Sequence, residues 1–203
     1  MGNLSLTEAS HALCRTSEVM ARLVERFGPA RFGARPRVGE RFEVLSRQIV
    51  YQQLAGQAAA AIWGRVREQE SEWTPATVRA LGAEPLRAAG LSGAKTRAIL
   101  DLAAHCERGS LDLTCLGRLP DQDVIAQLGQ VWGIGVWTAQ MFLIFSLRRL
   151  DVWPVGDLGV RKGYGLAHGW TEPPAAEELE SLGDRFRPYR SVAAWYCWRA
   201  TEI

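Results

Sequence analysis

The stretch QVWGIGVWTAQM, residues 130–141, decides the fold, because two glycines flank an isoleucine between two segments of helical periodicity. Glycine costs about 1 kcal/mol relative to alanine inside a helix. Gly133 and Gly135 therefore predict a tight turn between two helices. Two explanations stay open: the glycines allow a close reversal of direction, or they let an anion approach free backbone N–H groups at the start of the second helix.

Helical periodicity continues through most of the chain, and alternating β-type runs are nearly absent. Thr74 and Ser92 are expected to cap helices, and Asp157 stands where another helix should begin. The paired prolines 173–174 are expected to open a helix that ends near Leu182. Further helices are predicted over residues 40–54, 121–130, 136–147 and 189–200. The sequence therefore predicts an all-α fold.

Length and composition are those of an ordinary globular chain. Its 203 residues, 47% of them hydrophobic, suffice for one large domain or two small ones, and we expect a single compact domain of two lobes over residues 1–203. No apolar run approaches the roughly 20 residues of a membrane helix, and the N-terminus lacks the apolar region of a signal peptide. The net charge of +2 means that any electropositive surface must come from local clustering.

The cysteines and histidines show no metal-binding pattern. The four cysteines form no CxxC pair, and the three histidines are scattered along the chain. We therefore expect reduced thiols, mostly buried, and no zinc site.

Four segments of the chain together carry a family resemblance. The two central segments are LGQVWGIGVWTAQMF, residues 128–142, and DVWPVGDLGVRKG, residues 151–163. They are flanked by IVYQQLAGQAAA, residues 49–60, and RPYRSVAAWYCW, residues 187–198. Together they resemble the helix-hairpin-helix DNA glycosylase superfamily, specifically its 3-methyladenine DNA glycosylase II branch, which removes alkylated bases. The resemblance implies the compact two-lobed form, with the hairpin over about residues 121–147 and a helical pair over Leu4 to Phe27 packing onto the C-terminal lobe.

The resemblance implies that Asp157 is the catalytic carboxylate. Breaking an N-glycosidic bond builds positive charge on the deoxyribose, and a fixed carboxylate stabilises that charge and orients or deprotonates water. The alternative is that Asp157 only caps the helix that follows it. The two roles are compatible.

Relatives that also cut the DNA strand carry a lysine two residues after the second hairpin glycine, where its amine forms a Schiff base. In this chain Trp137 occupies that position. The resemblance therefore implies a monofunctional hydrolase that leaves an abasic site.

No cofactor is expected for the chemistry. Some relatives hold an iron–sulfur cluster on four closely spaced C-terminal cysteines, a pattern that this chain lacks. The hairpin of the family often binds a monovalent cation, sodium or potassium, through backbone carbonyls that correspond here to Gly129, Val131 and Ile134. Such an ion would position a phosphate.

The resemblance also implies how DNA is held. The target nucleotide must be extruded from the duplex, and Leu54 corresponds to the apolar wedge that fills the gap, supported by Gln52 or Gln53. The alternative is that Leu54 ends a core stripe and that the glutamines are solvated. The remaining DNA contacts expected from the resemblance are Gly133, Gly135, Thr138, Arg161 and Lys162.

Aromatic residues are candidates for the base pocket. The sequence has eight tryptophans, and an alkylated purine carries a positive charge that an aromatic face attracts by about 0.5 to 2 kcal/mol. We expect Trp137 and Trp198 to line the pocket, with Met141 and Tyr164 beside them. The alternative for any of these is a place in the core.

Two other functions stay open: a DNA-binding protein without catalysis, and a glycosylase for oxidised or mismatched bases. The expected partner is double-stranded DNA with alkylated bases, bound by a monomer that contacts no membrane. The expected location is the cytoplasm with the nucleoid in a bacterium, or the nucleus in a eukaryote. The sequence leaves open whether the lesions include hypoxanthine, 1-methyladenine or 3-methylcytosine.

Overall fold

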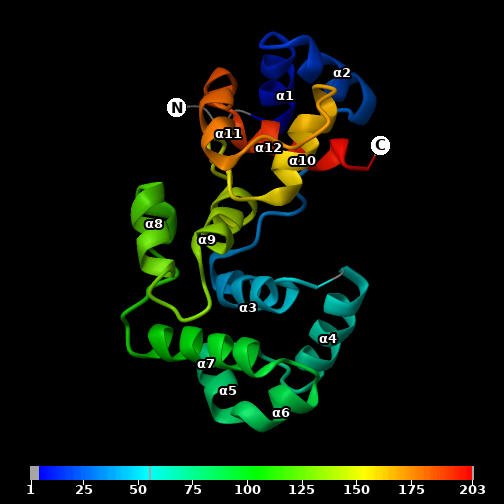
Figure 1. Cartoon of the computed structure of the whole chain (residues 1–203). Coiled ribbons are helices and arrows are strands. Elements are labelled where there is room, and N and C mark those ends of the chain that lie inside the picture. Colours follow the sequence, from blue (N-terminus) through cyan, green and yellow to red (C-terminus); the bar gives the residue numbers. More distant parts are fainter. Residues whose placement is uncertain (1–4, 55, 203) are drawn as a thin grey trace. The chain divides into compact units, whose positions relative to one another are not determined.

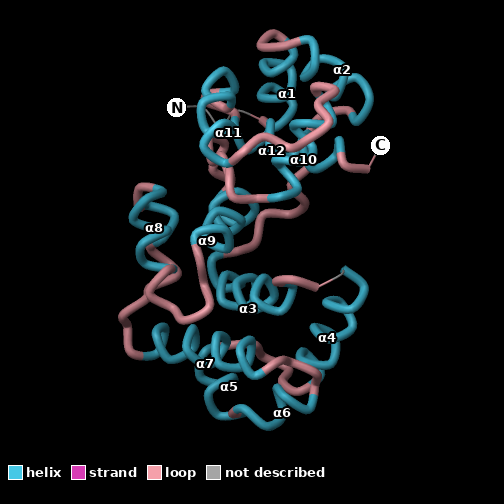
Figure 2. Tube along the Cα trace, in the orientation of Figure 1, coloured by secondary structure: helices cyan, strands magenta, loops and turns pink. Residues whose placement is uncertain are grey.

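The computed structural model describes residues 5–54 and 56–202, and within these ranges the regular elements are all helical (Figure 2). The prediction of an all-α fold is confirmed. By contact density the chain divides into two compact units. Unit 1 contains the chain up to Ala34 and from Arg148 onward, and unit 2 is Arg35–Leu147.

Unit 1 is built from the two ends of the chain, shown in blue and in yellow to red in Figure 1. Its helices are α1 (Leu6–Cys14), α2 (Glu18–Phe27), α10 (Leu158–Ala167), α11 (Ala176–Leu182) and α12 (Arg190–Ala200). Helix α12 packs against α1, α2 and α10. The Tyr196 hydroxyl donates to the carbonyl of Gly28 at 2.8 Å and so ties α12 to the end of α2. The predicted N-terminal helical pair on the C-terminal lobe is confirmed, except for Leu4, which lies outside the described residues.

Helices α10 and α12 cross so closely that their contact requires glycine. A Cβ at Gly163 would overlap the backbone carbonyl of Cys197, an atom that no rotamer change can move aside. Both residues are buried. The crossing therefore fixes the position of α10, which Asp157 precedes as its N-cap.

Unit 2 holds the central part of the chain. Its helices are α3 (Arg41–Tyr51), α4 (Gly56–Glu68), α5 (Pro75–Leu81), α6 (Ala83–Ala88), α7 (Gly93–Glu107), α8 (Asp121–Leu128) and α9 (Val136–Phe142). The 15-residue α7 packs against α3, α5 and α6, and α8 and α9 form the predicted hairpin. Arg41 is 5% exposed and donates to the carbonyls of Leu113 and Thr114, and burial lowers its pKa.

Helix starts agree with the predictions at Thr74, Ser92 and Asp157, each of which caps its helix with a side-chain oxygen. Helix α11 begins at Ala176 instead of at the prolines 173–174. The helix after the hairpin is regular only to Phe142 and continues to Leu147 as a π-helical turn.

The prediction of one domain over residues 1–203 stays a prediction. Among the described residues no helix is long and apolar enough to cross a membrane.

Replacing Gly163 by alanine is predicted to destabilise the protein by about 3 kcal/mol or more, because the added methyl forces α10 away from the α12 backbone. Urea unfolding followed by circular dichroism measures this free energy. The matched control is Gly64→Ala in α4, where open space surrounds the glycine and alanine is expected to stabilise the helix by up to about 1 kcal/mol. An equal effect of the two substitutions would contradict the close crossing.

Candidate catalytic carboxylate and DNA-contacting residues

Asp157 precedes α10 and is fixed by two hydrogen bonds to the same oxygen. Its Oδ1 accepts from the backbone N–H of Val160 at 2.8 Å and from the indole N–H of Trp198 at 2.9 Å. The first bond is the helix cap, and the residue is 8% exposed. The helix start and the α12 side chain therefore set the orientation of this carboxylate together.

The thiol of Cys197 lies near this carboxylate. It is fully buried, and burial together with the Asp157 charge raises its pKa far above the ordinary value. The thiol therefore stays protonated at neutral pH.

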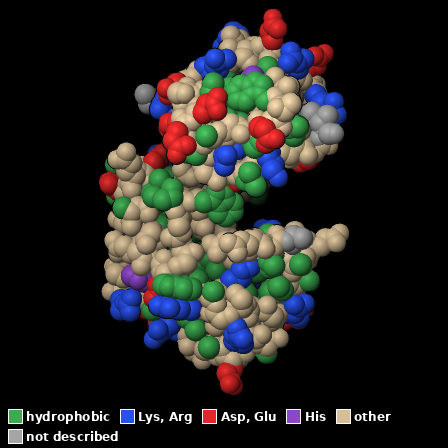
Figure 3. All heavy atoms as spheres, viewed as in Figure 1, with side chains coloured by type: hydrophobic (Ala, Val, Ile, Leu, Met, Phe, Trp, Pro, Cys, Tyr) green, Lys and Arg blue, Asp and Glu red, His purple; other side chains and the backbone are tan. Residues whose placement is uncertain are grey.

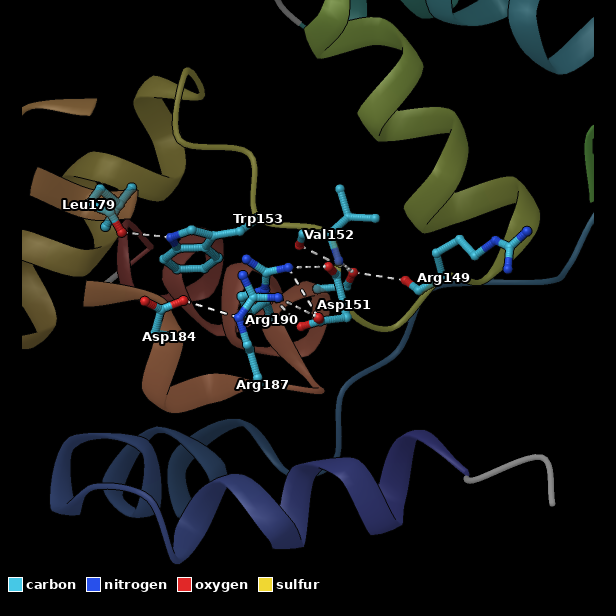
Figure 4. A network of polar contacts seen from close by, with 9 residues as sticks. Arg149, Asp151, Val152, Trp153, Leu179, Asp184, Arg187 and Arg190 are labelled. Atoms are coloured by element: carbon cyan, nitrogen blue, oxygen red, sulfur yellow. Dashed lines mark hydrogen bonds and ion pairs between the residues drawn. The ribbon is translucent and has the colours of Figure 1, made fainter. Parts of the chain in front are cut away.

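The segment that leads to Asp157 is anchored by ion pairs (Figure 4). Arg190, at the start of α12, donates through Nε to Asp151 Oδ1 at 2.7 Å and through its terminal nitrogen to Oδ2 at 3.0 Å. Arg187 donates to the same carboxylate at 3.1 Å. The forked contact of Arg190 is the stronger one, because its side chain is 11% exposed whereas that of Arg187 is 50% exposed.

Hydrogen bonds to the backbone and the Trp153 ring continue this anchoring, as Figure 4 shows. The N–H of Val152 donates to the Ser191 hydroxyl at 2.9 Å, and that hydroxyl donates to the carbonyl of Arg149 at 2.8 Å. The indole of Trp153 donates to the carbonyl of Leu179 at 2.7 Å. The loop before Asp157 is thereby held at several successive residues.

In unit 2 the two hairpin glycines differ in what they accommodate. Gly133 has φ +84° and lies against the α7 helix, where a Cβ would be 2.9 Å from the methyl of Ala98. Gly135 caps α9 with φ −93°, and nothing lies within 4 Å of where its Cβ would be. Close packing of the two helices therefore explains the glycine at position 133. It does not explain the glycine at position 135, where a side chain would have space.

The predicted wedge segment, residues 52–54, follows α3. Leu54 is 39% exposed, and Gln53 has a left-handed backbone with φ +54°. The Gln52 amide donates to the carbonyl of Gly133 at 3.1 Å and to the hydroxyl of Thr138 at 3.0 Å. The wedge segment and the hairpin are therefore joined within one unit.

Thr138 is 2% exposed, and its hydroxyl is used by Gln52. A contact of its side chain with DNA is therefore not available in this conformation. A contact between DNA and the backbone of Thr138 stays a prediction.

The candidate pocket residues differ in burial. Trp137 is 41% exposed on α9, whereas Met141 is 6% exposed. Tyr164 is 1% exposed and stacks on His168 with ring centroids 4.0 Å apart, so the structure gives it the core position that the sequence left as the alternative. The indole N–H of Trp198 donates to Asp157, and the predicted place of its ring face in the pocket stays a prediction.

The two predicted phosphate contacts on α10, Arg161 and Lys162, differ in whether the protein itself already binds the side chain. Lys162 is exposed on α10, whereas Arg161 donates through Nε to the carbonyl of Pro174 at 2.7 Å. In unit 2, Lys and Arg side chains gather over α5, α6 and α7 on the face shown in Figure 3. A hollow of about 500 Å³ in this unit is lined by Arg79, Arg87, Arg97 and Arg108, with Asp101 as its one acidic lining residue among those described. This local cluster is positive although the net charge is only +2.

The described residues contain no cluster of three or more His, Cys, Asp or Glu side chains that fits a metal ion. The predicted cation ligands are backbone carbonyls, and that of Val131 also accepts the N–H of Ile134 at 3.1 Å. A carbonyl oxygen has two lone pairs, so this bond still permits a cation ligand. The hydrogen bond at Val131 is therefore compatible with the implied ion, and the cation site stays a prediction.

Contacts of the predicted site that the sequence missed are the anchors of other elements. Lys95 and Asp101 on α7 bind the wedge segment and the hairpin, and Asp151 with Arg190 holds the loop before Asp157. Asp151 and Arg190 lie within the segments 151–163 and 187–198 quoted from the sequence, whereas Lys95 and Asp101 lie in none of the quoted segments. Nothing in the sequence indicates which residue each of them contacts.

A family model described as HhH-GPD superfamily base excision DNA repair protein matches residues 47–188. A curated relative named DNA-3-methyladenine glycosylase 1, from Schizosaccharomyces pombe, is 34% identical over 98% of this chain and 89% of its own length.

Solved structures give the same result. A 3-methyladenine DNA glycosylase of Schizosaccharomyces pombe in complex with abasic DNA matches with a TM-score of 0.86 and 33% identity, over 97% of this chain and 98% of its own. A DNA-3-methyladenine glycosidase from Bacillus halodurans matches with a TM-score of 0.81 and 34% identity, over 98% of this chain and 89% of its own. The resemblance inferred from the sequence motifs is confirmed.

Replacing Arg190 by methionine is predicted to destabilise the protein by about 2 to 3 kcal/mol, because the substitution leaves Asp151 without its forked partner. Urea unfolding measures the loss. The control is Arg187→Met, which removes an exposed pair to the same carboxylate and is expected to cost less than about 1 kcal/mol. Equal costs would show that the Arg190 fork does not dominate this anchor.

Proposed function

The chain belongs to the HhH-GPD superfamily of base excision DNA repair proteins and is a DNA glycosylase, and from this premise we propose that its substrates are alkylated bases of the 3-methyladenine and 7-methylguanine type. The proposed reaction is hydrolysis of the N-glycosidic bond, with Asp157 as the catalytic carboxylate. The single observation that supports this role is the fixed carboxylate, held by the Val160 N–H and the Trp198 indole.

The chemistry needs one carboxylate when the leaving base is cationic. As the bond between C1′ of the deoxyribose and the base nitrogen breaks, its electron pair moves to the base, which departs neutral. Positive charge then develops at C1′, and the Asp157 carboxylate stabilises that charge. Water adds to C1′ and gives its proton to Asp157, so that the products are a free base and an abasic site.

Selectivity for a cationic base agrees with exposed aromatic residues. Trp137, which is 41% exposed on α9, offers a ring face to which a positively charged purine is attracted. A hydrolytic mechanism without strand cleavage also agrees with Trp137, since an indole has no nucleophilic amine.

DNA would be held by the hairpin and the wedge segment of unit 2. Open space at Gly135 suits the close approach of a phosphate to the backbone N–H groups that follow it. Leu54, exposed at the end of the α3 segment, would fill the gap left by the extruded nucleotide. Gln53, Arg161 and Lys162 would add contacts to the strand.

A monovalent cation would be held by the carbonyls of Gly129, Val131 and Ile134. When bound, the ion supplies positive charge beside a phosphate and takes no part in bond breaking. We propose that the enzyme acts as a monomer on double-stranded DNA, in the cytoplasm with the nucleoid in a bacterium or in the nucleus in a eukaryote.

Asp157→Asn is predicted to slow base release at least about 100-fold, because asparagine keeps the helix cap but removes the negative charge. Methylated genomic DNA is incubated with each protein, and the released bases are identified by chromatography. Comparable release by the two proteins would refute the catalytic role of Asp157.

The same assay separates the alternatives. Tight DNA binding without release of any base by the wild-type protein would favour a DNA-binding protein without catalysis. Release from oxidised or mismatched duplexes alone would favour a different lesion class, and strand cleavage without added alkali would contradict a monofunctional enzyme.

Trp198→Phe is predicted to lower kcat about tenfold with KM nearly unchanged, because the ring is kept while the hydrogen bond that orients Asp157 is lost. Single-turnover kinetics on a lesion-containing duplex measure the effect. The control is Trp195→Phe on the same helix, where the indole faces Tyr196 and Arg199. A loss of equal size in both variants would mean that the indole bond to Asp157 has no special role.

A further inference from the structure

Lys95, in the first turn of α7, holds the end of α3. Its ammonium group donates to the backbone carbonyls of Val50 and Gln52, each at 2.7 Å. These carbonyls belong to the last turn of α3 and its C-cap, where a helix presents unpaired acceptors and partial negative charge. The ammonium group therefore fixes the backbone of residues 50–52, directly before Leu54.

Gln52 connects this gripped backbone to the hairpin. Its carbonyl accepts from Lys95, and its side-chain amide donates to the carbonyl of Gly133 and the hydroxyl of Thr138. One residue thus links α7, the turn of the hairpin and the first part of α9. Its neighbour Gln53 has the left-handed backbone, a conformation that non-glycine residues keep only when surrounding contacts enforce it.

Helix α7 also holds the hairpin directly. One turn and a half beyond Lys95, the carboxylate of Asp101 accepts the backbone N–H of Trp132 at 2.7 Å. Between them, Ala98 lies against Gly133 and leaves no room for a side chain there. Successive residues on one face of α7 therefore contact the wedge segment and then the hairpin.

We propose that α7 positions the wedge segment and the hairpin as a single preformed element. Lys95 is the positioning residue: it holds the backbone that carries Leu54 in place while Leu54 inserts between stacked bases. This inference rests on the proposed function, because it assigns to Lys95 a part in extruding the target nucleotide. Lys95 acts through the backbone of residues 50–52 and not by touching the reacting atoms.

The energetic reason is that unstacking a base costs a few kcal/mol per step, which the inserted side chain must offset. If the loop that carries the inserted side chain is displaced by the stacked bases, insertion offsets less of the free energy of unstacking. Two short bonds from a cation to carbonyls, within a part-buried site, resist that movement better than neutral bonds do. Loss of Lys95 should therefore matter in proportion to how firmly the target base is stacked and paired.

The test compares two substrates in single-turnover assays with wild-type protein and with Lys95→Met. One duplex pairs the alkylated base normally, and the other places it opposite an abasic-site analogue between mismatches, so that it is already unstacked. We expect Lys95→Met to lose about tenfold in rate on the paired duplex and less than about threefold on the unstacked one. Equal losses on both, or no loss, would overturn the inference.

Two further variants sharpen the result. Lys95→Arg keeps a cationic donor and is expected to retain most of the wild-type rate, whereas Arg118→Met, which removes an exposed arginine outside α7, is expected to leave the rate unchanged. Gln52→Met removes the link to the hairpin and should reproduce the dependence on stacking, which keeps the inference testable if Lys95→Met folds poorly. A Gln52→Met variant that loses equally on both substrates would count against the single preformed element.

Fluorescence of 2-aminopurine beside the lesion separates failure of this inference from failure of the proposed function, since it reports unstacking without base release. Wild-type protein should raise the fluorescence on binding, and Lys95→Met should raise it less. Unstacking by the wild type without base release would refute the catalytic proposal and leave this inference standing. Equal fluorescence in the two proteins, or none with the wild type, would overturn the inference itself. A Lys95→Met variant that unstacks normally but loses one unit of salt dependence would identify Lys95 as a phosphate contact instead.

Discussion

The bond between the Trp198 indole and the Asp157 carboxylate is the interaction that the α10–α12 crossing and the loop anchors of unit 1 keep in place. A carboxylate can stabilise developing positive charge only if its orientation is set before the reaction begins. The orientation is set by α10, whose first turn Asp157 caps, and by α12, which carries Trp198. The close crossing of these helices at Gly163 keeps the two groups in register.

The loop before Asp157 follows the same constraint. An irregular segment would let the carboxylate drift, and here Asp151, Val152 and Trp153 are each bonded to another element of the unit. The forked contact between Arg190 and Asp151 starts at the same helix that supplies Trp198. Helix α12 therefore contacts the segment 151–157 at both ends, through Arg190 at Asp151 and through Trp198 at Asp157.

In unit 2, the segments that are proposed to contact DNA are likewise held in place by another element. The wedge segment and the hairpin come from distant parts of the sequence, yet both are fastened to α7, through Lys95 and Asp101. Their hydrogen-bond partners are backbone groups, so the contacts fix the path of the chain. A preformed arrangement of this kind reduces the ordering cost that binding must otherwise meet.

The sequence by itself determined the helical class, the hairpin and its glycines, the cap at Asp157 and the family, because periodicity, capping and motif spacing are local properties. Only the tertiary structure decided what distant residues do. It placed Tyr164 in the core, joined the Trp198 indole N–H to Asp157, and joined the Thr138 hydroxyl to the Gln52 amide. It also assigned Gly133 to packing against Ala98, while the space at Gly135 stays open. These outcomes depend on which helices cross and at what distance, and a spacing along the chain carries no record of that.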